Sequence, residues 1–223
     1  ASIAWPASHC PQCQTPLKAW HNIPVISYLF LRGKCAFCKT SISQRYPLIE
    51  LLTASLGLMI AWLLGPSIAT VMTLLLMYML VALSFIDLDH KLLPDQLTLP
   101  LLWLGLAVNA FGLVTHLEDA FWGAVAGYVS LWLVYWGFRL ATGKHGMGYG
   151  DFKLLAALGA WLGWQALPII VLVAALAGMI AGLALRIRTS PTDPQMPFGP
   201  FLSMGGLVYL LWGEQLWRTF GSL

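Results

Sequence analysis

Two aspartates stand at the borders of long apolar runs in this chain. Asp151 lies in Gly148-Tyr149-Gly150-Asp151, shortly before an uncharged run over 154–185, and Asp87 follows an uncharged run over 68–86. Ionisable groups at membrane depth are costly and usually functional. If both side chains lie on one side of a bilayer, they could act as an acid/base pair. For Asp151 the alternative is a helix N-cap after a glycine turn.

The glycines beside Asp151 support the first interpretation. Gly148 and Gly150 allow backbone conformations that other residues resist, and they permit close approach of another chain segment. We therefore interpret Gly148 and Gly150 as residues that support the catalytic loop. The nearby acids have simpler roles: Asp89 is interpreted as a solvated or paired loop residue, and Asp95 as a first-turn or capping residue. Glu50 is assigned no chemistry.

All four cysteines belong to two CxxC pairs, Cys10–Cys13 and Cys35–Cys38. Two such pairs can supply four thiolates to a closed tetrahedral zinc site, which would be structural because no coordination position stays open. The alternatives are disulfides, which a reducing cytoplasm disfavours, or a thioredoxin-like redox motif, for which no βαβ pattern is present. His9 and His21 are interpreted as surface histidines.

The composition identifies the elements that must position these residues. Of 223 residues, 59% are hydrophobic and 9% are charged, whereas a soluble domain has about 25% charged residues. The chain is therefore predicted to be an α-helical polytopic membrane protein. Residues 1–47 are polar and should form a small cytoplasmic zinc-binding domain, and residues 48–223 the transmembrane domain. Lys and Arg are scattered, which argues against nucleic acid as a partner.

About seven transmembrane helices are predicted, since each needs roughly 20 apolar residues. The run at 154–185 is too long for one span and is divided near Gly163 and Pro168, leaving an unusually short first helix. The predicted spans are 48–64, 68–86, 97–114, 120–138, two within 154–185, and 198–213. A full-length form is expected to have an eighth helix ahead of the cysteine domain.

The basic residues predict the orientation. Eleven of the 12 Lys and Arg residues flank or lie in segments on one side of these spans, and Arg218 is the exception. By the positive-inside rule that side is cytoplasmic. Asp87 and Asp151 both face it, so the condition for a pair is met.

Several motifs in chain order resemble those of the bacterial type IV prepilin peptidases. Gly148-Tyr149-Gly150-Asp151 matches the GxGD signature of a class of membrane aspartyl peptidases. The segments 85–95 and 42–50 and the two CxxC pairs are also similar to this family. By motif position, the resemblance assigns the catalytic pair to Asp87 and Asp151. Asp87 is preferred to Asp89 because it lies seven residues before Pro94.

The resemblance implies an enzyme of the bacterial inner membrane with two activities. It would cleave the basic leader from type IV prepilins or type II secretion pseudopilins at the cytoplasmic face. It would then methylate the new N-terminus with S-adenosylmethionine. Gly33 and Lys34 are the candidates for methyl-donor binding that the resemblance suggests, and a hairpin turn beside the zinc site is the alternative for them.

Two aspartates that share a site cannot both ionise cheaply, so one should keep a proton. Because Asp87 ends a helix and Asp151 begins one, the helix dipoles predict that Asp87 holds the proton and Asp151 is the general base. The competing functions are an ion-coupled transporter, which needs acids near the bilayer midplane, and a non-catalytic zinc-ribbon adaptor, in which neither aspartate would be needed.

Overall fold

A computed structural model describes residues 9–143, 146–188 and 196–220. The chain divides into two compact units, Ala1–Met59 and Ile60–Leu223. Helix α2 (Arg45–Leu64) belongs partly to each unit, so the unit boundary falls later than the predicted boundary after residue 47. Within the described ranges the ordered elements are helices and two isolated β-bridges, which confirms the all-helical class.

The first unit is built around two loops. The bridge between His9 and Pro16 closes one loop, and the bridge between Lys34 and Ser41 closes the other. Each loop encloses one CxxC pair. A 3-10 helix η1 (Ala19–Asn22), the short helix α1 (Ile26–Phe30) and the first part of α2 complete this unit. Its small core therefore depends on the two cysteine loops.

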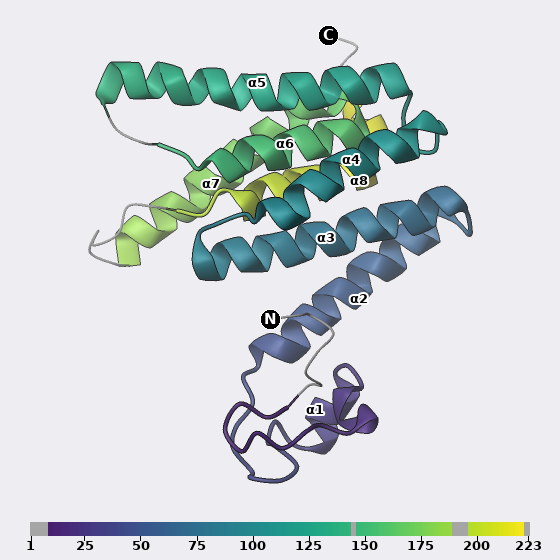
Figure 1. Ribbon diagram of the computed structural model, residues 1–223, viewed down its shortest axis with the longest axis vertical. Coiled ribbons are helices and arrows are strands. Elements are labelled where there is room, and N and C mark those ends of the chain that lie inside the picture. The colour runs from purple at the N-terminus through teal and green to yellow at the C-terminus, as the bar shows by residue number, and fades with distance from the viewer. Residues whose placement is uncertain (1–8, 144–145, 189–195, 221–223) are drawn as a thin grey trace. The chain divides into compact units, whose positions relative to one another are not determined.

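The second unit is a helical bundle, shown in Figure 1. It contains α3 (Ile68–His90), α4 (Asp95–Ala110), α5 (Leu117–Thr142), α6 (Tyr149–Leu162), α7 (Leu167–Arg188) and α8 (Gly199–Phe220). Helix α6 is central: of its residues from Asp151 to Leu162 only Lys153 is not fully buried. It contacts α4, α5, α7 and α8. A helix that is apolar on all sides belongs in such a position.

Small residues let α5 and α6 approach closely. Gly123 and Gly159 face each other, and a Cβ atom at either position would overlap the backbone of the other. Gly127, one turn after Gly123, lies against the backbone of Leu155 in the same way. Spaced small residues of this kind are common where helices pack inside membranes. They bring α6 against α5 along most of its length.

Polar side chains attach α4 to the far end of α6. The Asn109 amide donates hydrogen bonds to the carbonyls of Ala160 (2.8 Å) and Trp161 (3.0 Å). The Trp161 indole donates to the Leu101 carbonyl at 2.8 Å, and its ring fills the space that Gly105 leaves open. Every polar group in this contact has a partner, as a buried polar contact requires. The depth of α6 in the bundle is therefore fixed.

The predicted break within 154–185 is confirmed. Helix α6 ends at Leu162, Gly163 adopts a left-handed φ of 83°, and Trp164–Ala166 forms a 3-10 turn before α7 begins. Helix α6 has 14 residues, which gives a length of only about 21 Å. This length is shorter than the roughly 30 Å needed to cross the hydrocarbon core of a bilayer. Helix α6 is therefore too short to cross the core by itself.

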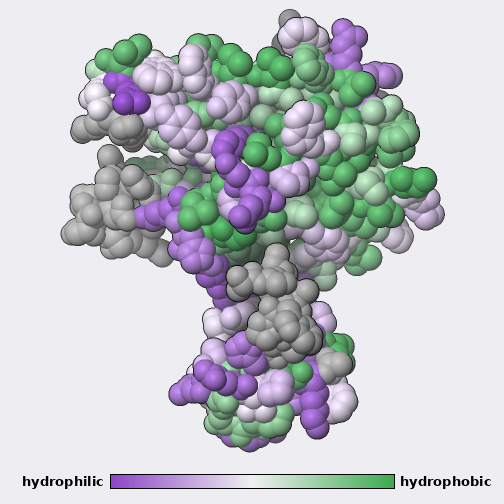
Figure 2. All heavy atoms as spheres, viewed as in Figure 1, coloured by the Kyte–Doolittle hydropathy of each residue, from purple (hydrophilic) through white to green (hydrophobic). Residues whose placement is uncertain are grey.

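Four helices are long and apolar enough to cross a membrane among the residues described: Arg45–Leu64, Ile68–His90, Leu117–Thr142 and Trp164–Ala184. The chain is therefore a multi-pass membrane protein. A helix forms in each of the seven predicted spans, but α4 and α6 have only 16 and 14 residues, and α8, with 22 residues, is not among the four, so the structure does not establish seven crossings. Hydrophobic residues cover much of the bundle face seen in Figure 2. The exposed large apolar side chains of the bundle include Leu133.

Candidate active site and metal centre

The two cysteine loops have the same local structure. In the first, Cys10 N–H donates to the Thr15 carbonyl and Gln14 N–H donates to the Cys10 carbonyl. In the second, Cys35 N–H donates to Thr40 and Lys39 N–H donates to Cys35. The residue after each second cysteine has a positive φ, 54° at Gln14 and 60° at Lys39. Each loop is thus folded so that both of its thiols point to one side.

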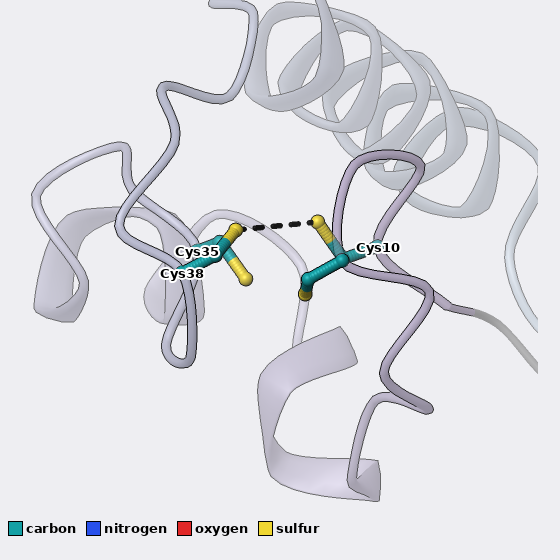
Figure 3. Close-up of side chains that lie close together, drawn as sticks. Cys10, Cys35 and Cys38 are labelled. Atoms are coloured by element: carbon teal, nitrogen blue, oxygen red, sulfur yellow. Dashed lines mark hydrogen bonds between the residues drawn. The ribbon is translucent and has the colours of Figure 1, made fainter.

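The two loops bring the four sulfur atoms together. All four Sγ atoms of Cys10, Cys13, Cys35 and Cys38 lie within 4.8 Å of one another. Figure 3 shows the Cys10, Cys35 and Cys38 side chains turned towards each other, with 3.9 Å between the sulfurs of Cys10 and Cys38. A tetrahedral zinc with Zn–S bonds of about 2.3 Å separates its sulfurs by roughly 3.8 Å. The predicted ligand set therefore fits a four-thiolate metal site, and all four cysteines are free thiols.

The hydrogen bonds in these loops favour thiolates at two positions. Bonds to Thr15, first through its side chain and then its backbone, lower the pKa of Cys13 to about 6. Backbone bonds from Cys38 and Phe37 lower the pKa of Cys35. At Cys38 a backbone bond from Thr40 favours the thiolate, but burial and the other cysteines raise the pKa to about 11. Because the thiolate is the form that binds a metal ion, the hydrogen bonds at Cys13 and Cys35 favour metal binding.

Gly33 and Lys34 lie on the second loop. Gly33 is buried with a φ of 67°, and a Cβ atom there would come within 2.8 Å of the Tyr28 hydroxyl oxygen. Its carbonyl accepts the Ile42 N–H at 2.7 Å, while Lys34 is exposed and forms the bridge with Ser41. Both residues therefore lie in the turn beside the cysteine pair, where the hairpin alternative places them, and Gly33 also makes room for the Tyr28 ring.

In the second unit, Asp87 lies in the last turn of α3 and is 4% exposed. Its Oδ2 atom accepts the backbone N–H of Gly199, the first residue of α8, at 2.9 Å. The positive end of α8 therefore faces this carboxylate and opposes the negative end of α3. The predicted position of the shared proton compared the end of α3 at Asp87 with the start of α6 at Asp151 and did not include this contact with α8.

Asp151 lies in the first turn of α6, two residues after its N-terminus, and is 6% exposed. Gly148 is the N-cap residue, with an extended backbone. The carboxyl group also makes a backbone hydrogen bond with Gly148. Asp151 thus shares features with a capping residue, but its burial exceeds what an ordinary surface cap needs. Asp151 thus lies in the N-terminal turn of α6, whereas Asp87, at the end of α3, faces the N-terminal end of α8.

Leu93 connects the surroundings of the two aspartates. It lies against Gly150, where a Cβ atom would approach the Leu93 Cβ to 2.7 Å, and against Gly199, where the closest approach would be 3.2 Å. The two carboxyl groups also interact electrostatically. Segments 87–93, 148–151 and 198–199 thus converge on one small region. Gly150 makes the close approach that the sequence predicted for it.

Two features of this region were not predicted. One is the Gly199 amide, because nothing in its local sequence signals a contact with a residue 112 positions away. The other is Lys153, whose Nζ lies 2.6 Å from Asp95 Oδ1. Asp95 is a first-turn residue of α4, as predicted, and Pro94 is the N-cap residue. No local sequence signal pairs Asp95 with a lysine 58 positions away.

Comparisons with known proteins agree with the motifs. Residues 1–64 match the bacterial peptidase A24 N-terminal domain, and residues 74–183 match the type IV leader peptidase family. Proteins named prepilin leader peptidase/N-methyltransferase are similar over nearly the whole chain. The protein of Stutzerimonas stutzeri is 55% identical over 216 residues (96% of this chain, 75% of the relative), and that of Neisseria gonorrhoeae is 50% identical over 214 residues (96% and 74%).

A third relative, from Aeromonas salmonicida, has the same name and is 55% identical over 218 residues, which are 97% of this chain and 75% of the relative. No solved structure gives a significant match. Identity of this extent across both units exceeds what a shared motif alone produces. The chain therefore belongs to the type IV leader peptidase family, the A24 peptidases.

Proposed function

We propose that this chain cleaves the leader of type IV prepilins or pseudopilins and methylates the new N-terminus. The relatives are named for both activities. The observation that carries the peptidase part is the burial of Asp87 and Asp151 in one region at the ends of α3 and α6. Buried, interacting carboxyl groups are what an aspartic peptidase requires.

In this proposal the two aspartates share one proton. The ionised carboxylate takes a proton from the attacking water, and the protonated one donates a hydrogen bond to the scissile carbonyl. Neither step needs a metal or a covalent intermediate. The Gly199 N–H holds the Asp87 carboxyl in one orientation, so that its other oxygen can face water or substrate.

The helix ends no longer favour Asp87 as the protonated partner. Asp87 receives the Gly199 amide at the start of α8, and Asp151 lies at the start of α6. Since both sites stabilise negative charge, we propose that the pair titrates as a unit, with the proton moving between the two carboxyl groups during the reaction.

The substrate is proposed to enter from the membrane. The apolar segment of a pilin would dock beside the spans while its basic leader stays at the cytoplasmic surface. The lysine and arginine distribution places the aspartates and the cysteine unit on that side of the bacterial inner membrane. Seven crossings of the bilayer by this chain are part of the proposal.

We further propose that the four cysteines hold a structural zinc ion. Four thiolates at this separation suit Zn²⁺, and a closed ligand shell would stabilise the first unit without taking part in cleavage. S-adenosylmethionine would supply an electrophilic methyl group to the new N-terminal amine. The residues that could bind it lie in the first unit and are considered below.

A prepilin assay tests the proposed function. Wild-type protein and the Asp87→Asn and Asp151→Asn variants are incubated with a prepilin and S-adenosylmethionine, and cleavage and methylation are read separately by mass spectrometry. Wild type should produce the shortened, methylated pilin, and each variant should leave the prepilin intact. Full cleavage by either variant would exclude the aspartate pair, and no cleavage by wild type would favour the non-catalytic zinc-ribbon adaptor.

A further inference from the structure

The first unit contains a cavity of about 590 Å³ beside the cysteine cluster. Its size falls within the range of roughly 300–1,000 Å³ that is usual for small-molecule sites. The lining includes Glu50, Tyr28, Tyr46, His21 and Asn22, together with Cys10 and Cys35. The peptidase chemistry described above involves none of these residues.

The charge of the cavity is set by one group. Glu50 is the only acidic residue in 1–59, a segment that also has five Lys and Arg residues. None of those basic residues lines the cavity. In a unit that is otherwise basic, the single carboxylate thus belongs to the lining of this cavity. A cationic ligand would be attracted to it, and an anionic ligand would not.

A hydrogen bond from a residue with a strained backbone holds Glu50 in this position. Its Oε2 atom accepts the Val25 N–H at 2.7 Å, and Val25 has a φ of 60°. A β-branched residue with a positive φ is a genuine outlier. Such strain persists only where the surrounding structure maintains it, and it is frequent at ligand sites. Glu50 has a second carboxylate oxygen that this bond does not use.

The aromatic lining adds a second element of recognition. The Tyr28 hydroxyl donates to the Ile42 carbonyl at 3.4 Å, which ties its ring to the second cysteine loop. Gly33 permits this placement, because any side chain there would displace the ring. Aromatic rings stack on nucleobases and attract cations over their faces. Within the described residues, the Nδ1 atom of His21 is buried without a hydrogen-bond partner and belongs to the same lining.

We propose that this cavity binds the methyl donor, an adenosyl sulfonium cation, with Glu50 recognising its positive charge and Tyr28 packing against it. The inference rests on the proposed methyltransferase function and places that function in the first unit. In the transfer, the amine lone pair forms the N–C bond, the C–S electron pair stays on the sulfur, and the amine proton leaves to solvent. The product thioether has lost the sulfonium charge, so Glu50 favours the donor over the product. Gly33 acts by positioning Tyr28.

Direct binding tests this proposal. Isothermal titration of the full chain with S-adenosylmethionine and S-adenosylhomocysteine compares the charged donor with the product. Glu50→Gln keeps an acceptor for the Val25 N–H and removes the charge. It should weaken donor binding at least about tenfold and weaken product binding less. Tyr28→Leu should weaken both ligands, whereas Tyr28→Phe should bind nearly as wild type. Exposed Glu118 provides the matched control, Glu118→Gln, with unchanged binding.

Two further readings separate the possible failures. Zinc content shows that each variant retains the folded first unit, and leader cleavage should stay at the wild-type rate. Donor binding by Glu50→Gln and Tyr28→Leu equal to wild type would overturn the site. If Glu50→Gln weakened the binding of the donor and of the product by the same factor, Glu50 would not recognise the sulfonium charge. If the wild-type chain bound S-adenosylmethionine but transferred no methyl group, the proposed methyltransferase function would be refuted instead.

Discussion

Gly199 donates its backbone N–H to the Asp87 carboxylate at 2.9 Å, although 112 positions separate the two residues in the chain. The bond joins the last turn of α3 to the first residue of α8. It has two effects: it orients a buried carboxyl group, and it presents that group with the positive end of a helix. The candidate site therefore requires α8, which contributes no acid of its own to it.

This relationship predicts that Gly199→Ala strongly reduces leader cleavage. A Cβ atom at Gly199 would lie 2.7 Å from Asp87 Oδ2 and 3.2 Å from Leu93, so the carboxyl group or α8 must move. We expect at least about a hundredfold loss in kcat/KM, since displacements of about 1 Å cost this much at active sites. Steady-state cleavage of a prepilin measures it.

Gly137→Ala is the matched control, because Gly137 lies within α5 and no atom stands within 4 Å of a Cβ there. It should keep full activity and unfold no more easily than wild type. A Gly199→Ala protein as active as Gly137→Ala would show that the Gly199 contact with Asp87 does not matter for cleavage.

A second prediction concerns Asp95 and Lys153, which tie the start of α4 to the start of α6 near Asp151. Their side chains are 58% and 26% exposed, so the pair should contribute less than about 1 kcal/mol to stability. We expect Asp95→Asn and Lys153→Met each to lower the cleavage rate several-fold, with little effect on thermal unfolding. The double variant should be no slower than either single variant.

The exchanged pair Asp95→Lys with Lys153→Asp tests whether the contact itself matters, and it should recover part of the rate. A positioning role for this pair would be contradicted if the rate losses of the two single variants multiplied in the double variant and the exchanged pair recovered none of the rate.

A third prediction concerns the metal. Cys38→Ser should remove the zinc ion, loosen the first unit and abolish methylation, because structural zinc supplies folding free energy directly. Cleavage should persist, since Asp87, Asp151 and their packing partners all belong to the second unit. Metal content, limited proteolysis and product mass measure the three effects. Tight zinc binding by the serine variant, or loss of cleavage equal to the loss of methylation, would contradict this division.

The sequence predicted the parts that depend on local pattern. Apolar runs gave the helices, Gly163 and Pro168 marked the break after α6, and the CxxC spacing identified the sulfur cluster. The resemblance and the charge pattern singled out Asp87 and Asp151. Each of these features is visible within a few residues of the chain or in the sign of its charges, and so could be recognised without a structure.

The remaining features are contacts between distant segments. The predicted proton position used the dipole of the helix that carries Asp87 and could not include α8, which reaches it from the end of the chain. Likewise, Asn109 and Trp161 read as ordinary residues of apolar helices, yet their hydrogen bonds fix α6. Glu50 was assigned no chemistry because its cavity exists only after the cysteine loops have folded.

The most direct test of the central claim compares Asp87→Asn, Asp151→Asn and the double variant in one cleavage assay. Each single variant should be inactive or close to the limit of detection. Because two residues that act as one acid/base unit do not contribute independently, the double variant should cleave no more slowly than either single variant. If either single variant cleaves at a rate near wild type, or if the two losses multiply in the double variant, Asp87 and Asp151 do not form one catalytic pair.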